Sequence, residues 1–267
     1  MKRIMLKISY DGTNYCGWQK QPNAVTIEGV LNQKLSKLLG ENIEIIGASR
    51  TDSGVHAMGN VAVFDTTTHI PAHKIALVLS RRLPRDIVIQ SSKEVPLYFH
   101  PREYESIKTY EYQILNTKRA QPIKRLYYYH VHKDLNIESM KEAARYLVGT
   151  HDYKSFCLAK TQTQSTVRTI YSIDITKNDD IIKFNIKGNG FLYNMVRCIV
   201  GTLIYVGRGR YSPQHVKDIL YKKDRNVAGP NAPAHGLILQ DTEYILDKDG
   251  KPVMRQIKFA KHIDMTE

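Results

Sequence analysis

The chain has 267 residues, which is enough for one large domain or two ordinary ones to bury a core without disulfides or metals. Its 39 Lys and Arg against 26 Asp and Glu leave a formal net charge of +13, which favours a polyanionic partner and makes nucleic acid the leading candidate. Seventeen tyrosines against six phenylalanines add rings on which bases can stack, although a merely soluble basic protein is the plainer alternative.

The first part of the chain mixes strand and helix patterns. Residues 4–10 alternate apolar and polar side chains, as on a half-buried strand. Thr26 can cap a helix that Gly40 ends, and Pro71 suits the first turn of a helix that runs to about Ser80. Further strands are predicted at residues 43–46, 60–65 and 87–90.

The rest of the chain repeats this mixture. Strands are predicted at residues 109–115, 126–132, 167–176 and 180–187, and helices at 137–148, 191–206 and 213–221. The strands have the one-sided pattern of antiparallel sheets. Prolines and charged residues interrupt the pattern near residue 105. We therefore expect an α+β protein with domains at 1–105 and 106–267 and a basic cleft between these two halves.

No feature of the sequence indicates secretion or a membrane. The three cysteines are widely spaced and form no CxxC pair, so a reducing compartment, the cytoplasm, is expected. The first ten residues lack the continuous apolar run of a signal peptide. The longest apolar stretch, 191–206, is shorter than the roughly 20 residues of a spanning helix and contains Arg197.

One glycine-punctuated loop stands out, at residues 47–60 with the sequence GASRTDSGVHAMGN. Asp52 lies at its centre, with Arg50 two residues before it and His56 four residues after it. Such a loop can present a carboxylate to a ligand. Taken alone, however, an aspartate in a turn more often bonds its own backbone or caps a helix.

Arg197 is the single charged residue in the stretch 188–207. Helical periodicity places it on the side opposite Met195 and Ile199, so it faces something other than the main core. A buried guanidinium needs an anion, so a carboxylate or phosphate should lie opposite it. From this helix alone, the favoured interpretation is that Arg197 forms an ordinary structural salt bridge.

Other polar and aromatic residues have structural explanations. Tyr110 and Tyr112 should project from one face of a strand, where a core position is the default. His130 and His132 lack further ligands at convincing spacing, so no metal site is expected, and the pair His151-Asp152 suits a loop or cap. No nucleotide-binding motif is present in the sequence, so no cofactor is expected.

Six ordered segments together resemble the tRNA pseudouridine synthase A family. They are YDGTNYCGWQKQ with TIEGVL, SRTDSGVHAMGNV, FHPRE followed by KTYEY, HDYKSF, NGFLYNMVRCIVGTLIYVGRG and AGPNAPAHGLIL. The resemblance extends to about Tyr244. Local departures occur at Ser49, Asn60, Pro101 and Asn194, none of which replaces a catalytic group.

The resemblance implies the pseudouridine synthase fold and a role for each site residue. Asp52 would be the catalytic aspartate, and Arg197 would pair with it and keep it ionised by lowering its pKa. Tyr110 would stack on the flipped uracil and assist removal of the C5 proton. The residues implied in RNA binding are Arg50, which would act during base extrusion, His56, Arg102 and Arg168.

The resemblance also implies a substrate and an assembly. The substrate would be tRNA, at uridines 38–40 of the anticodon stem-loop, and the protein would be a homodimer without a cofactor. Two rivals stay open at this point. A non-catalytic RNA-binding protein or RNA chaperone would explain the charge equally well, and a hydrolase of nucleic acid or glycoside would usually need paired acids or metal-binding carboxylates.

Overall fold

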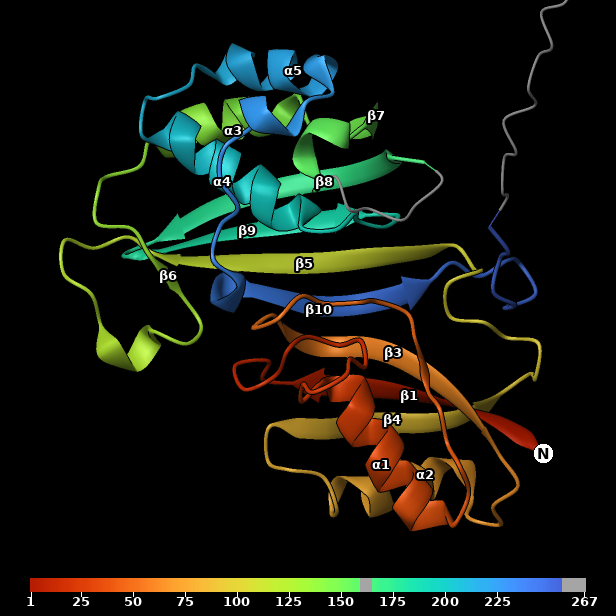
Figure 1. Ribbon diagram of the computed structural model, residues 1–267. Helices are drawn as coiled ribbons and strands as arrows, with labels where there is room; N and C mark the ends of the chain where they lie inside the picture. The colour runs from red at the N-terminus through yellow and green to blue at the C-terminus, as the bar shows by residue number, and fades with distance from the viewer. Residues whose placement is uncertain (159–164, 256–267) are drawn as a thin grey trace, which may run out of the picture.

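A computed structural model describes residues 1–158 and 165–255 (Figure 1). The strands are β1 (Lys2–Tyr10), β2 (Ile46–Gly47), β3 (His56–Thr66), β4 (Ile87–Val95), β5 (Ser106–Leu115), β6 (Tyr129–His130), β7 (Gly149–Asp152), β8 (Val167–Asn178), β9 (Ile181–Gly188) and β10 (Leu237–Tyr244). The α-helices are α1 (Ile27–Leu39), α2 (Ala72–Ser80), α3 (Ile137–Arg145), α4 (Met195–Gly207) and α5 (Pro213–Lys222).

The ten strands form one continuous sheet. Its main path has the order β4-β1-β3-β10-β5-β9-β8-β7, with β2 paired to β3 and β6 paired to β5. Most neighbours are antiparallel, as predicted, while β10 runs parallel to β3 and β6 runs parallel to β5. The fold is therefore α+β with a largely antiparallel sheet, which confirms the predicted fold class.

Strand β10 joins the early and late parts of the sheet, and the sequence did not predict it. It pairs with β3 on one side and with β5 on the other. Only Leu237 and Leu239 are buried hydrophobic residues of β10, because polar side chains follow them. Both neighbours of β10 are distant from it in the chain, so its pairing could not be inferred from the local sequence. The domain boundary at residue 105 remains a prediction, since the sheet is continuous across it.

Helix ends follow the predicted capping residues. Thr26 accepts a hydrogen bond from the amide of Gly29, Asn136 accepts one from Ser139, and Gly40 ends α1 with φ 69°. In Figure 1, α3, α4 and α5 lie together beside the part of the sheet that holds β8 and β9, whereas α1 and α2 lie beside β1 and β4.

Several predicted elements differ from the structure. Strands β3 and β4 are longer than the predicted 60–65 and 87–90, and α3 ends at Arg145, before the predicted residue 148. The strand expected at 43–46 is reduced to Ile46–Gly47, and the one at 126–132 to Tyr129–His130. His151 and Asp152 belong to strand β7 rather than to a loop, although Asp152 also accepts a hydrogen bond from the Lys154 amide. Helix α4 begins at Met195, not at residue 191, because Asn194 adopts a left-handed backbone (φ 60°). In the described part of the chain, no helix is both long enough and apolar enough to cross a membrane.

Candidate active site

The Asp52 loop connects β2 to β3 and is fixed through its backbone. The carbonyl oxygen of Ala48 accepts a hydrogen bond from Lys108 Nζ (2.8 Å), and that of Ser49 accepts one from Asn60 Nδ2 (3.0 Å). The Trp18 amide donates to the carbonyl oxygen of Thr51 (3.0 Å). These contacts come from three separate segments, so they hold the loop in one conformation and give Asp52 a defined direction.

Side-chain hydrogen bonds also hold the Asp52 loop. The hydroxyl of Thr51 hydrogen-bonds the buried Tyr10 hydroxyl (2.7 Å), and Asn60, which is fully buried, also donates to Tyr10 (3.3 Å). Gly54 completes the turn with φ 77°, a conformation that residues with a Cβ rarely adopt. The glycine-punctuated loop is therefore a rigid support for Asp52.

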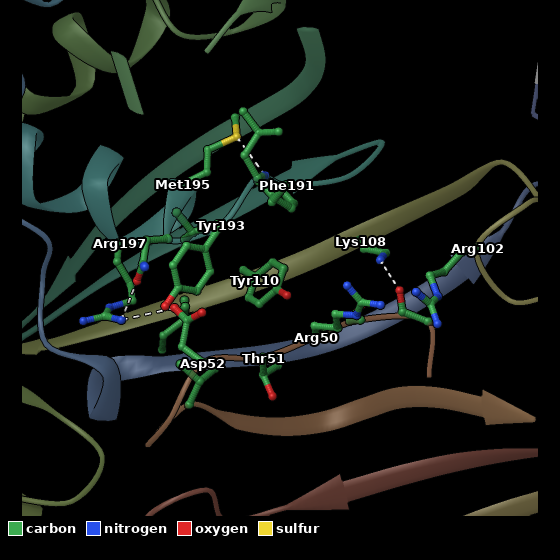
Figure 2. A pocket seen from close by; sticks show the side chains of 17 residues that line it. Arg50, Thr51, Asp52, Arg102, Lys108, Tyr110, Phe191, Tyr193, Met195 and Arg197 are labelled. Carbon is green, nitrogen blue, oxygen red and sulfur yellow. Dashed lines mark hydrogen bonds and ion pairs between the residues drawn. The ribbon is translucent and has the colours of Figure 1, made fainter. Parts of the chain in front are cut away.

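Asp52 forms an ion pair with Arg197 of α4, with 3.1 Å between Oδ2 and Nη1 (Figure 2). Arg197 Nη1 also donates to Asn194 Oδ1 (2.6 Å), and its Nε donates to the carbonyl oxygen of Ala232 (2.8 Å). The expected anion opposite Arg197 is thus confirmed and is the carboxylate of Asp52. Three hydrogen-bond acceptors fix the position of the Arg197 guanidinium, and the guanidinium thereby orients the carboxylate of Asp52.

The pKa of Asp52 differs from the sequence-based expectation. Burial raises the pKa of Asp52 above its ordinary value, and the charge and hydrogen bond of Arg197 oppose this shift without cancelling it. The prediction that Arg197 acts to lower the pKa of Asp52 and so favours the ionised carboxylate is confirmed. The expectation of a lowered pKa is wrong, because desolvation of the carboxylate is the larger effect.

Tyr110 projects from β5 into the same pocket. Its ring packs edge-to-face against Phe191, with 5.2 Å between ring centroids and an interplanar angle of 88°. Burial and the nearby charge of Asp52 raise the pKa of Tyr110, which keeps its phenol neutral. Tyr112, on the same face of β5, is fully buried and donates to the carbonyl oxygen of Pro233. Tyr112 is therefore a core residue, whereas Tyr110 faces the pocket.

These residues line a pocket of about 600 Å³, which is large enough for a nucleotide. Figure 2 shows Arg197 and Asp52 toward one end, Tyr110 in the middle, and Arg50, Lys108 and Arg102 gathered at the other end. Among the described residues that line it, Asp52 is the single carboxylate. The pocket thus offers one acidic group beside an aromatic ring, and a cationic end a short distance away.

The predicted RNA-binding residues do not all reach this pocket. Arg50 and Arg102 line it, and the charge of Arg168, on β8, acts on Lys108 at its cationic end. His56 lies elsewhere and is 4% exposed. Its placement in the interior leaves no surface with which to bind an RNA strand.

His56 has a structural role instead. Its Nδ1 accepts a hydrogen bond from the Gly12 amide (3.1 Å) and lies 3.0 Å from Asp11 Oδ1, while Nε2 lies 3.1 Å from the carbonyl oxygen of Leu126. With hydrogen on Nε2, His56 accepts from the Gly12 amide and donates to the carbonyl oxygen of Leu126, whereas a hydrogen bond to Asp11 requires hydrogen on Nδ1. His56 therefore ties the loop after β1 to the segment before β6.

The pocket-lining residues that sequence reasoning did not identify as site residues include Lys108, Phe191, Tyr193 and Asn194. Lys108 had a usable signal, since it precedes Tyr110 by two positions and must share its face of β5. Asn194 had been noted as a departure from the family pattern and was not identified as a site residue. Its contact with Arg197 depends on the left-handed turn before α4, which periodicity does not reveal.

Comparison with known proteins shows the family. A family model described as tRNA pseudouridine synthase matches residues 7–105 and 143–245. The chain belongs to the tRNA pseudouridine synthase family. The resemblance inferred from the six sequence segments is thereby confirmed.

Curated relatives match nearly their whole length. The chain is 51% identical over 239 residues, 90% of this chain and 98% of the relative, to tRNA pseudouridine synthase A from Thermoanaerobacter sp. (strain X514). It is 48% identical over 244 residues to the protein of that name from Clostridium kluyveri, with 91% of this chain and 100% of the relative covered. A tRNA pseudouridine synthase A from Brevibacillus brevis is 44% identical over 244 residues.

Proposed function

We propose that this protein isomerises uridine to pseudouridine in tRNA, with Asp52 as the catalytic carboxylate. The observation that supports this most directly is the Asp52–Arg197 ion pair in a pocket that also contains Tyr110, in a chain of the tRNA pseudouridine synthase family. The reaction breaks the bond from C1′ to N1 and forms one from C1′ to C5, while the C5 proton is released and N1 gains one. It needs neither an outside energy source nor a cofactor.

Asp52 acts in its ionised form. It either adds to the base or to the sugar, or it removes the 2′ proton to give a glycal intermediate, and each of these routes needs a carboxylate with a fixed direction. Arg197 supplies that direction and favours the charged form. The limited exposure of the Asp52 side chain, 15%, strengthens its electrostatic interaction with a bound nucleotide.

Tyr110 contacts the target base. The uridine must leave its stack to enter the pocket, at a cost of roughly a few kcal/mol. Stacking on the Tyr110 ring, which Phe191 supports from the side, offsets part of that cost. Because the phenol is neutral, it can take up the C5 proton only by passing on its own, so we assign Tyr110 chiefly to base binding and orientation.

The cationic end of the pocket binds the RNA backbone. We assign Arg50 and Arg102 to phosphate contacts because both line the pocket and neither belongs to an ion pair among the described residues. We further propose that the target uridines are positions 38–40 of the anticodon stem-loop, that the protein is a homodimer, and that it acts in the cytoplasm. The first two points rest on the family resemblance, and the third rests on the three widely spaced cysteines.

The test is tritium release from tRNA transcripts labelled at uracil C5, with the wild type and Asp52→Asn compared. Release by the wild type and none by Asp52→Asn, with tRNA binding kept by both, is the expected result. Failure of a folded, tRNA-binding wild type to release tritium from a full set of tRNAs would favour the non-catalytic RNA-binding protein. Shortened RNA or free uracil would favour the hydrolase.

A further inference from the structure

The residues after β10 lie beyond the family match, which ends at residue 245, while the curated relatives are covered over 98–100% of their own length. The segment 245–255, here called the C-terminal strap, begins at the last matched residue and is hydrogen-bonded to an earlier part of the chain. It folds back beside the chain that leads into β5 (Figure 1). A segment outside the shared family region therefore contacts the element on which Tyr110 lies.

Backbone hydrogen bonds hold the C-terminal strap in place. The Glu105 amide donates to the carbonyl oxygen of Val253 (2.8 Å), the Ile245 amide donates to that of Glu105 (3.0 Å), and the Arg255 amide donates to that of Glu103 (2.8 Å). At the tip, Asp247 Oδ1 accepts from the amides of Asp249 and Lys251. This pairing fixes the position of Arg255 at the end of the strap.

The Arg255 side chain is aimed back toward the sheet. Its Nε donates to the carbonyl oxygen of Tyr104 (3.0 Å), and its Nη2 donates to Asn189 O (2.9 Å) and to Ser106 Oγ (3.3 Å). These acceptors are neutral. No ion pair between described residues includes Arg255.

Arg255 belongs to a group of cations that crowd one another. A side chain at Gly190 would place its Cβ 3.8 Å from Arg168 Nε and 4.0 Å from Arg255 Nη2, so the two guanidinium groups flank the same point. Burial and then the charges of Arg255, Arg102 and Arg168 lower the pKa of Lys108 to about 7. Arg102, Lys108 and Arg168 are likewise absent from the ion pairs of the described residues.

Among residues 1–158 and 165–255, no carboxylate forms an ion pair with any of these four cations. Glu28 acts on Arg102, but its Oε2 is already engaged by the Lys20 amide (2.6 Å) and by Gln19. Like charges held close together destabilise the free protein unless an anion binds between them. Lys108 and Arg102 line the pocket that receives the target nucleotide. An RNA phosphate next to that nucleotide is therefore the anion that can bind between these cations.

We propose that Arg255 of the C-terminal strap joins Arg168, Lys108 and Arg102 in a subsite for an RNA backbone phosphate adjoining the flipped nucleotide. This inference rests on the proposed function only for the identity of the RNA. If the C-terminal strap only fixed the end of the chain to the sheet, neutral hydrogen-bond donors would be sufficient and a positively charged side chain would not be needed. The geometry instead places a fixed guanidinium where three other cations already lie.

The experiment measures tRNA affinity as a function of salt for the wild type, Arg255→Gln, Arg255→Lys and Lys248→Gln. Lys248 is exposed at the tip of the strap and provides a control for loss of one charge. Arg255→Gln should bind about 10-fold more weakly at low salt, with a slope of log affinity against log salt shallower by about 0.7–0.9. Arg255→Lys should keep the wild-type slope, and Lys248→Gln should change neither quantity.

Two results would overturn the subsite. One is an unchanged salt slope in Arg255→Gln, whether or not its melting temperature falls, since a strap that only fixed the end of the chain would affect folding and not phosphate contacts. The other is an equal loss of slope in Lys248→Gln, which would mean a diffuse charge effect. Tritium release by the wild type is measured in parallel. Its absence together with the Arg255 effect would reject the proposed isomerisation and keep the phosphate subsite.

Discussion

Arg197 and Asp52 lie 145 positions apart in the chain and meet with 3.1 Å between Nη1 and Oδ2. This contact joins α4 to the loop between β2 and β3. A second contact, from Lys108 Nζ to the carbonyl oxygen of Ala48, joins β5 to the same loop. The two contacts fix the loop at both ends of the pocket, and each can be tested by substitution.

Replacement of Arg197 should shift the pH dependence of catalysis. Its positive charge favours ionised Asp52, so Arg197→Gln should raise the pKa of that carboxyl and move the acid limb of kcat/KM to higher pH. Arg197→Lys keeps the charge and should shift the limb less, while its single amine cannot reproduce the three contacts of the guanidinium. Superimposable pH profiles of tritium release for the wild type and Arg197→Gln would contradict this assignment.

Asn194 should position Arg197 without touching the substrate's reacting atoms. Asn194→Gly keeps the left-handed backbone (φ 60°) and removes the acceptor of Arg197 Nη1, so kcat should fall about 10-fold with little loss of stability. Asn194→Ala removes the same acceptor and adds backbone strain of roughly 1–2 kcal/mol. Denaturant unfolding and single-turnover rates separate the two effects. Equal stability of the glycine and alanine variants would argue against the strain.

Tyr110→Phe should bind tRNA as the wild type does and lose part of the rate. The phenylalanine ring keeps the edge-to-face contact with Phe191 and the stacking surface, while the hydroxyl is lost. Tyr110→Ala should weaken tRNA binding in addition, by about 1–3 kcal/mol for one stacked base. Affinity measured beside the tritium-release rate distinguishes these outcomes, and complete loss of binding by Tyr110→Phe would be inconsistent with a stacking role.

Lys108 should make stability depend on pH. Its pKa in the folded protein is about 7, below the value of about 10.4 in an unfolded chain. Between these values the unfolded state binds the additional proton, so the penalty for folding with this lysine is full below pH 7 and is relieved as pH rises toward 10. The difference in unfolding free energy between Lys108→Met and the wild type should therefore decline by at most about 1.4 kcal/mol per pH unit.

Urea unfolding at pH 6, 7, 8 and 9 measures this difference. The exposed Lys187 on the neighbouring strand β9 provides the control, because Lys187→Met should give no comparable trend. The loss of the hydrogen bond to Ala48 lowers the stability of Lys108→Met at every pH and leaves the trend intact. A pH-independent difference for Lys108→Met would mean that the amine keeps an ordinary pKa.

The sequence predicted local structure well where the signals were local. Thr26, Asn136 and Gly40 set helix ends through bonds to residues within one turn, and alternation along residues 4–10 predicted β1. The sequence did not predict β10, which pairs with residues far away in the chain. The start of α4 was also placed four residues too early, because Asn194 takes a left-handed conformation (φ 60°) that local periodicity does not reveal.

The sequence by itself determined the basic charge, the α+β class, the family and the need for an anion opposite Arg197. These follow from composition, periodicity, ordered motifs and the cost of burying an unpaired guanidinium. The family resemblance also predicted Asp52 as that anion, and the structure confirmed it. Only the tertiary structure decided that His56 is a buried structural residue, that burial outweighs Arg197 in the pKa of Asp52, and that Arg255 lies among other cations. The physical reason is that desolvation and electrostatic interactions depend on distances between segments remote in sequence, which no local pattern specifies.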